Sequence, residues 1–102
     1  MEERLKVLLH ALQGYHPQRV ILFGSTARGD TDTASDLDVL VVKDTEESFV
    51  HRLETMAELC PHGIHADILV YTPEEIALMV ADKNPFILRA LAEGKVVYEA
   101  KS

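Results

Sequence analysis

Hydrophobic residues recur along the first part of the chain at the spacing of a helix. Within residues 2–14, leucines lie three and four positions apart and so share one helix face. These leucines are Leu5, Leu8, Leu9 and Leu12. Gly14 indicates a stop and Pro17 prevents continuation, so we expect an amphipathic packing helix that ends before residue 17.

Four later segments carry apolar runs without a helical period and predict strands. They cover residues 19–23, 36–42, 64–71 and 95–99. The first contains Val-Ile-Leu-Phe, a run without polar alternation that is typical of a strand covered on both faces. The last, Lys-Val-Val-Tyr-Glu, is expected at an edge of the sheet.

Helix signals fall between these strands. Residues 45–60 carry an apolar stripe at helical spacing, and either Thr45 or Ser48 suits the N-cap. The stripe consists of Phe49, Leu53, Met56 and Cys60. We therefore expect this segment to pack against the sheet through that stripe.

Two more helices are expected before the last strand. Residues 72–75, Thr-Pro-Glu-Glu, are a strong helix start, because Thr72 suits the N-cap and Glu75 completes a capping box. A further helix is expected over residues 86–92, which an Asn-Pro pair precedes and Gly94 ends.

Strands that alternate with helices predict an α/β (α+β) fold with a small mixed β-sheet. We expect the helices to pack mainly on one face of the sheet. The chain has 102 residues, which suits one core, and no repeat, low-complexity segment or linker divides it. We therefore expect a single domain over residues 1–102.

Composition narrows the class of protein. Hydrophobic residues make up 47% of the chain and charged residues 26%, as in ordinary soluble proteins, and no apolar run approaches the roughly 20 residues of a membrane span. Cys60 is the sole cysteine, which excludes an internal disulfide and indicates a reducing cytoplasm. A net charge of -7 without a cluster of Lys and Arg argues against direct nucleic-acid binding.

Two acids open the second strand. Because side chains alternate along a strand, Asp36 and Asp38 are expected on one face, with Cα atoms about 6.5 to 7 Å apart. Mg²⁺ prefers one or two carboxylates together with substrate phosphates. Asp67 on the third strand is a natural third acid, and three converging carboxylates suit a two-metal site. Taken alone, the first two acids could also be a solvated strand end.

Gly24 and Ser25 end the first strand. A glycine permits close backbone approach, and a serine at the N-terminus of a short helix over residues 26–28 offers its hydroxyl and free N–H groups to an anion. Ser25 could equally serve as the N-cap of that helix. The sequence has no G-x-x-x-x-G-K-[ST] and no G-x-G-x-x-G after the strand, which excludes a P-loop and argues against a dinucleotide fold.

This part of the chain resembles the signature of a known family. Residues 24–29 and 35–38 match every fixed position of the pattern G-S-x-A-R-G-x5-S-D-x-D. The pattern is that of the minimal nucleotidyltransferase (MNT) domains of the polymerase-β superfamily. The segment around Asp67 resembles that of the family's third acid, and the resemblance covers the whole chain.

The resemblance implies a nucleotidyltransferase fold and a catalytic site built on three acids. Asp36 and Asp38 would hold two Mg²⁺ ions. Asp67 would hold one of them and help to deprotonate the attacking hydroxyl. These three residues are the candidate catalytic and metal-binding residues.

The same resemblance implies a nucleotide-binding loop. Gly24 and Ser25 would bind the phosphates of ATP. Arg28 would support the phosphate loop or contact the nucleotide, although it could also pair with Asp36. Ser35 belongs to the same nucleotide-binding motif, where its hydroxyl could brace the loop.

The family also implies a biological role. Free-standing MNT proteins of about this size resemble antitoxins encoded beside HEPN-domain toxins, which are ribonucleases. Such antitoxins transfer AMP from ATP to a tyrosine of the toxin. We therefore expect a HEPN toxin as partner and an assembly with it.

Other interpretations stay open from the sequence. The chain could neutralise its partner by forming a complex, with catalysis secondary or absent, or it could transfer a nucleotidyl group to a small molecule. Cys60, His62 and His65 resemble metal ligands in type, but a zinc site needs a fourth ligand that the sequence does not identify.

Overall fold

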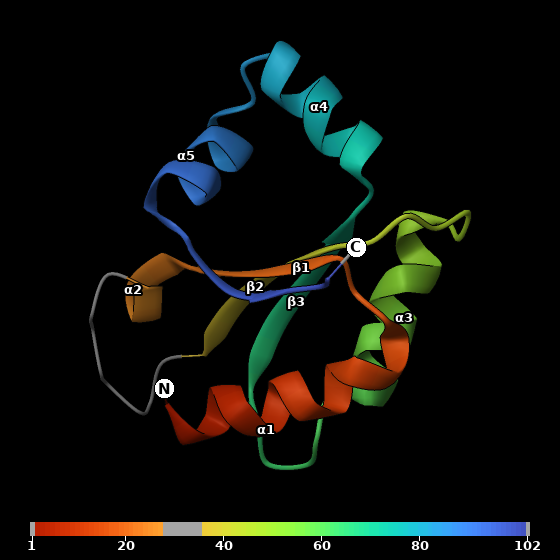
Figure 1. Ribbon diagram of the computed structural model, residues 1–102, viewed down its shortest axis with the longest axis vertical. Helices are drawn as coiled ribbons and strands as arrows, with labels where there is room; N and C mark the ends of the chain where they lie inside the picture. The colour runs from red at the N-terminus through yellow and green to blue at the C-terminus, as the bar shows by residue number, and fades with distance from the viewer. Residues whose placement is uncertain (1, 28–35, 102) are drawn as a thin grey trace.

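A four-stranded sheet lies at the centre of the computed structural model, which describes residues 2–27 and 36–101 (Figure 1). The strands are β1 (Arg19–Phe23), β2 (Leu37–Val42), β3 (Ala66–Tyr71) and β4 (Lys95–Glu99). The helices are α1 (Glu3–Leu12), α2 (Gly24–Ala27), α3 (Phe49–Leu59), α4 (Pro73–Ala81) and α5 (Pro85–Glu93). No helix within the described residues is long and apolar enough to cross a bilayer.

The sheet is mixed, as predicted. Its strand order is β3-β2-β1-β4. The inner strand β1 runs antiparallel to both β2 and β4, whereas β2 and β3 are parallel. The predicted α/β class is confirmed, and β4 lies at an edge of the sheet, as expected for the last strand.

Alternation along the strands sends apolar side chains to two cores of unequal size. The larger core lies under α1 and α3, and it includes Leu8, Val39 and Met56. The smaller core lies on the other face, where α4 and α5 cover the sheet (Figure 1). Its buried members are Ile21, Leu40 and Ile87. Most of the buried apolar side chains therefore lie on one face, and the second face stays partly open.

The first α-helix ends at Leu12, two residues before the predicted stop. After Leu12 the chain forms a short 3-10 turn, Gln13–Tyr15, which contains Gly14. The helical backbone ends at His16, which adopts the left-handed conformation with φ 58°. Gly14 therefore lies inside the 3-10 turn, and the helical segment ends before Pro17, as expected.

The helix expected over residues 45–60 begins later, at Phe49. Ser48 is its N-cap, because the Ser48 hydroxyl accepts a hydrogen bond from His51 N at 3.3 Å. Its buried stripe also differs from the prediction. Arg52 and Met56 are buried, whereas the Leu53 side chain is 39% exposed.

Both predicted helix starts in the second half are confirmed. Thr72 and Glu75 form a reciprocal capping box at α4. The Asn84 side chain caps α5 and accepts hydrogen bonds from Phe86 N at 2.9 Å and Ile87 N at 3.2 Å. These caps begin two helices that stand against the face of the sheet carrying Leu40.

Candidate active site

Asp38 and Asp67 lie side by side on neighbouring strands. They are Cα partners in the parallel pairing of β2 with β3. Residues paired in this way point to the same face, and adjacent strands lie about 4.8 Å apart. Asp38 is partly buried and Asp67 is exposed. The structure therefore brings together two of the three predicted acids, on the face of the sheet that α4 and α5 cover only in part.

Asp36 lies one residue outside the pairing of β2 with β3. It precedes the first residue of β2 and is exposed. Among residues 2–27 and 36–101, no group of three or more His, Cys, Asp or Glu side chains is close enough to form a metal site. The strand pairing thus brings together two of the three predicted acids, and the convergence of all three stays a prediction.

Gly24 fits closely against the first acid of the pair. It has φ 76°, a conformation that side chains rarely adopt, and a Cβ atom at this position would overlap Asp38 Oδ2. The register of β1 with β2 explains this contact, because Phe23 is the Cα partner of Asp38. A glycine is thus required where the first strand passes the carboxylate.

The remaining motif residues are placed only in part. Helix α2 begins at Gly24, so Ser25 lies within the helix and the prediction that it is the N-cap is wrong. Arg28 and Ser35, which the motif predicts at the nucleotide, lie outside the described residues.

A cavity of about 260 Å³ is lined by Gly24, the residue that borders Asp38 Oδ2. Its lining residues are Phe23, Gly24, Phe86, Arg89, Ala90 and Glu93. Sequence reasoning missed the contribution of α5. The caps at Asn84 and Gly94 predict that α5 exists, but no local signal shows that it packs beside α2.

Cys60, His62 and His65 do not form a site with a neighbouring acid in the described chain. Cys60 Sγ donates a hydrogen bond to Ile64 O at 3.3 Å. Burial raises the pKa of the Cys60 thiol, which favours the protonated form over the thiolate that metals bind. This cluster therefore contributes nothing to the candidate site.

Comparison with known proteins decides the family. Residues 6–102 match the model of the family described as "Polymerase beta, Nucleotidyltransferase". The chain belongs to this nucleotidyltransferase family. A protein of Methanocaldococcus jannaschii, named "Putative protein adenylyltransferase MJ0604", is 33% identical over 100 residues. That match covers 95% of this chain and 97% of the relative.

A solved structure shares the fold of this nucleotidyltransferase. It is described as "Crystal structure of the toxin-antitoxin with AMP-PNP". The superposition has a TM-score of 0.59 and covers 98% of this chain and 76% of the other, at 17% sequence identity. At this identity the likeness establishes the fold alone.

The paired acids fit a magnesium ion by the chemistry of their donor groups. Asp38 and Asp67 supply carboxylate oxygens from adjacent strands, and Mg²⁺ takes one or two such carboxylates and completes its coordination with water and phosphate. The missing side chain at Gly24 gives the Asp38 carboxylate the space that it occupies. Asp38 and Asp67 are thus the two paired residues that would hold such an ion.

Proposed function

We propose that this nucleotidyltransferase is a Mg²⁺-dependent antitoxin that transfers AMP from ATP to a tyrosine hydroxyl of a partner HEPN ribonuclease toxin. The observation that carries the proposal is the pairing of Asp38 with Asp67 beside Gly24. The family membership supports the reaction type. The lone Cys60 fits activity in the reducing cytoplasm.

The reaction is an in-line displacement at the α-phosphorus of ATP. The tyrosine oxygen forms a new bond to the α-phosphorus, the bond from that phosphorus to the bridging oxygen of the β-phosphate breaks, and pyrophosphate leaves. The exposed Asp67 carboxylate accepts the tyrosine proton. Asp38, held between β1 and β3, would hold the Mg²⁺ ion that positions the reacting phosphate.

Bound Mg²⁺ would neutralise charge that develops on the phosphate oxygens. Asp38 and Asp67 would hold it, and we assign Asp36 to the same role on the basis of the motif. Gly24, Ser25, Arg28 and Ser35 are proposed to bind the nucleotide.

The choice of group and acceptor has separate support. The Methanocaldococcus relative is named as a protein adenylyltransferase, which favours AMP as the group and a protein as the acceptor. The structural neighbour is a toxin-antitoxin with AMP-PNP, which favours a toxin as the partner and ATP as the donor. The HEPN identity of the toxin rests on the resemblance of the motif to antitoxins of that kind.

Incubation of the purified chain with ATP, Mg²⁺ and the protein encoded beside it tests this proposal. Mass spectrometry of the neighbour is expected to show AMP on a tyrosine. Asp38→Asn and Asp67→Asn should each abolish the adduct, whereas Asp82→Asn, an exposed acid after α4, should leave it unchanged. No adduct with a correctly folded pair, or transfer only to a small molecule, would contradict the proposal.

A second candidate function is neutralisation of the partner toxin by binding alone, without catalysis. Helix α5 and strand β4 leave apolar side chains exposed, among them Leu88, Leu91 and Val96, which gives a partner a surface to cover. A double variant Asp36→Asn, Asp38→Asn separates the two functions. Neutralisation that survives this change would favour binding. Neutralisation that is lost while the complex still forms would favour catalysis.

A further inference from the structure

The cavity between α2 and α5 shares a wall with the candidate active site. Gly24 lines the cavity and also borders Asp38 Oδ2. Across the sheet, Asp67 pairs with Asp38, and Asp38 pairs with Phe23, which is itself part of the cavity wall. Each step spans one strand separation of about 5 Å. A molecule bound at the two acids can therefore extend into the cavity.

The size of the cavity suits a part of a nucleotide. Pockets for whole drug-sized ligands occupy about 300–1,000 Å³, whereas this cavity measures about 260 Å³. In ATP the base lies one ribose away from the α-phosphate. A nucleotide whose α-phosphate lies at Asp38 and Asp67 can therefore place its base, one ribose away, in this cavity.

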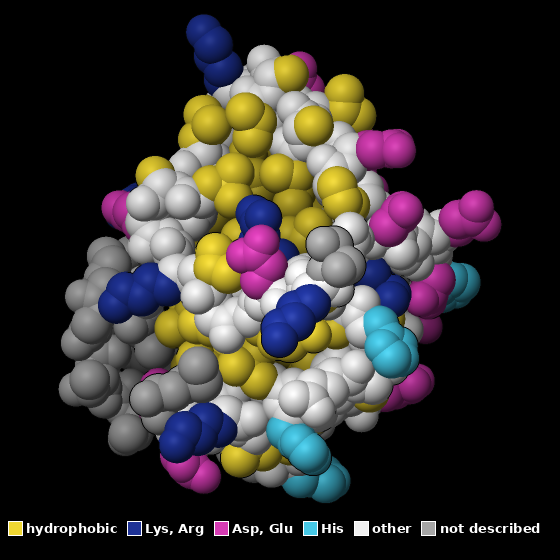
Figure 2. Space-filling model, viewed as in Figure 1, with side chains coloured by type: hydrophobic (Ala, Val, Ile, Leu, Met, Phe, Trp, Pro, Cys, Tyr) yellow, Lys and Arg dark blue, Asp and Glu magenta, His cyan; other side chains and the backbone are white. Residues whose placement is uncertain are grey.

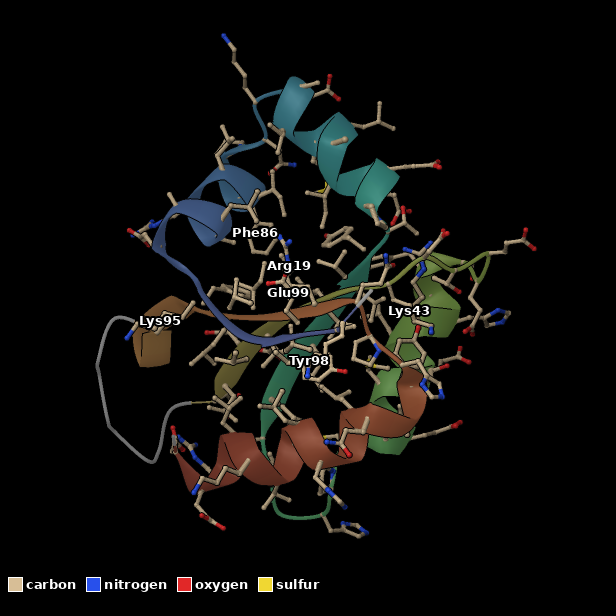
Figure 3. The ribbon with its side chains drawn as sticks, viewed as in Figure 1. Arg19, Lys43, Phe86, Lys95, Tyr98 and Glu99 are labelled. Carbon is tan, nitrogen blue, oxygen red and sulfur yellow. The ribbon has the colours of Figure 1, made fainter. Side chains whose placement is uncertain are left out.

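An aromatic wall gives the cavity affinity for a flat ring. Phe86 projects from α5 toward the sheet (Figure 3) and meets Phe23 edge to face, with ring centroids 5.5 Å apart at 84°. Phe86 remains 39% exposed, so part of its surface is open to a ligand. Aromatic side chains bind nucleic-acid bases by stacking, whatever the sequence.

The polar rim of the cavity argues for a base over a phosphate. Arg89 Nε donates a hydrogen bond to Glu93 Oε2 at 3.1 Å. This ion pair has no net charge, so it offers little attraction to a triphosphate. It does place donor and acceptor groups at the rim, the two kinds of group that a base edge presents.

We propose that this cavity receives the base of the nucleotide, with Phe86 stacking on the ring and Arg89 and Glu93 facing its polar edge. The inference rests on the proposed function, because it requires a nucleotide at Asp38 and Asp67. It assigns a task to α5 that the motif does not include.

Calorimetric titration of the chain with ATP and Mg²⁺, without any acceptor, tests the assignment. Phe86→Ala is expected to weaken ATP binding about tenfold, while binding of inorganic tripolyphosphate with Mg²⁺ stays unchanged. Leu88→Ala is the matched control, since Leu88 lies on the same helix with 40% exposure and does not line the cavity. This control should bind both ligands as the wild type does.

A second variant protects the test against a folding defect. If Phe86→Ala lowers the melting temperature more than Leu88→Ala does, Arg89→Ala replaces it, because the Arg89 side chain is 71% exposed. This variant should weaken ATP binding about threefold, roughly the loss of one hydrogen bond, and leave tripolyphosphate binding unchanged.

The contrary outcomes are distinct. ATP binding that Phe86→Ala and Arg89→Ala leave unchanged would overturn the base site alone, and so would an equal loss for ATP and tripolyphosphate. An unchanged dissociation constant for ATP with a raised KM for the protein acceptor would assign the cavity to the acceptor. A wild-type chain that binds no ATP would overturn the proposed function and the base site together.

Discussion

At the scale of single residues, the close contact of Gly24 with Asp38 fixes the position of one carboxylate of the candidate site. The backbone of Gly24 has φ 76°, and the space that a Cβ atom would take is filled by Asp38 Oδ2. The carboxylate is thus positioned by the strand behind it and by a residue that has no side chain. Any side chain at position 24 must displace the carboxylate.

Gly24→Ala is therefore expected to damage chemistry more than stability. The positive φ alone should cost about 1–2 kcal/mol in the free energy of unfolding. Displacement of Asp38 should lower kcat about 100-fold, as small misplacements at a reacting centre do. Steady-state transfer assays and urea denaturation measure the two effects.

Gly63→Ala is the matched control. Gly63 has φ 85°, but no atom lies within 4 Å of a Cβ placed there. This variant should lose about the same stability and keep wild-type kcat. Equal kcat values for the two variants would show that the contact with Asp38 has no role in catalysis.

At the scale of elements, one buried arginine joins three segments on the side of the molecule away from the cavity. Arg52 of α3 donates hydrogen bonds to Val70 O of β3 at 3.2 Å and to Glu75 Oε1 of α4 at 2.6 Å. Glu75 also accepts from Thr72 N at 2.8 Å within the capping box. The start of α4 is therefore held to α3 and β3 through a single guanidinium.

This network makes part of the stability depend on pH. The hydrogen bond from Arg52 is the main reason that the pKa of the Glu75 carboxyl lies below its ordinary value. Because the folded pKa is the lower one, the stabilisation is complete above the unfolded pKa of about 4.3 and is lost as the pH falls through the folded pKa. Glu75→Gln should cost about 1 kcal/mol at pH 7, a figure reduced because the side chain is more than one-third exposed.

Urea denaturation at pH 7 and at acid pH measures this effect. The difference in the free energy of unfolding between wild type and Glu75→Gln should shrink once the pH is well below 4.3. Glu74→Gln, an exposed neighbour in the same helical turn, should show only a small change at either pH. A difference for Glu75→Gln that is independent of pH would contradict the role of the ionised carboxylate.

The cap of α5 offers a second prediction at this scale. Asn84 Oδ1 satisfies two backbone N–H groups at the start of the helix. Asn84→Ala should therefore lower the free energy of unfolding by about 1 kcal/mol. Asn84→Ser should keep most of this stabilisation, because serine also caps helices. Thermal denaturation of both variants measures the difference, and equal losses would exclude the side-chain cap as the cause.

At the scale of the whole molecule, hydrophobic side chains gather on the surface over α4 and α5 (Figure 2). The exposed ones on these two helices are Leu78, Val80, Phe86, Leu88 and Leu91. They lie on the same side of the sheet as Asp38 and Asp67, so a protein that covers this surface can reach the reacting centre. We expect the acceptor protein to dock here.

Leu88→Lys should therefore weaken the complex with the acceptor protein at least about tenfold, the effect of roughly 1.4 kcal/mol at an interface. ATP binding should stay unchanged, since Leu88 does not line the nucleotide cavity. Val50→Lys is the control, because Val50 is 62% exposed on α3, a helix that packs on the opposite face of the sheet. Sedimentation of each variant mixed with the acceptor protein measures its affinity for that protein. If both variants weaken the complex equally, the contact lies elsewhere.

Much of the fold was predictable because its signals are local. The strand positions, the capping box at Thr72 and the helix that follows the Asn-Pro pair depend on neighbouring residues in the chain, and the structure confirms them. Period-two alternation also predicted correctly that Asp38 and Leu40 belong to the same face. The error at Leu53 arose where tertiary packing outweighed local preference, since Arg52 takes the buried position through partners on β3 and α4.

The sequence by itself determined the residue types of the site and the strands that carry them, because a motif and a two-residue period are properties of one segment. Tertiary structure alone decided which of these residues meet. The parallel register of β2 with β3 pairs Asp38 with Asp67, and the return of β4 along β1 brings α5 to the side of α2. Strand register and helix packing are set by contacts between segments far apart in the chain, which no local pattern encodes.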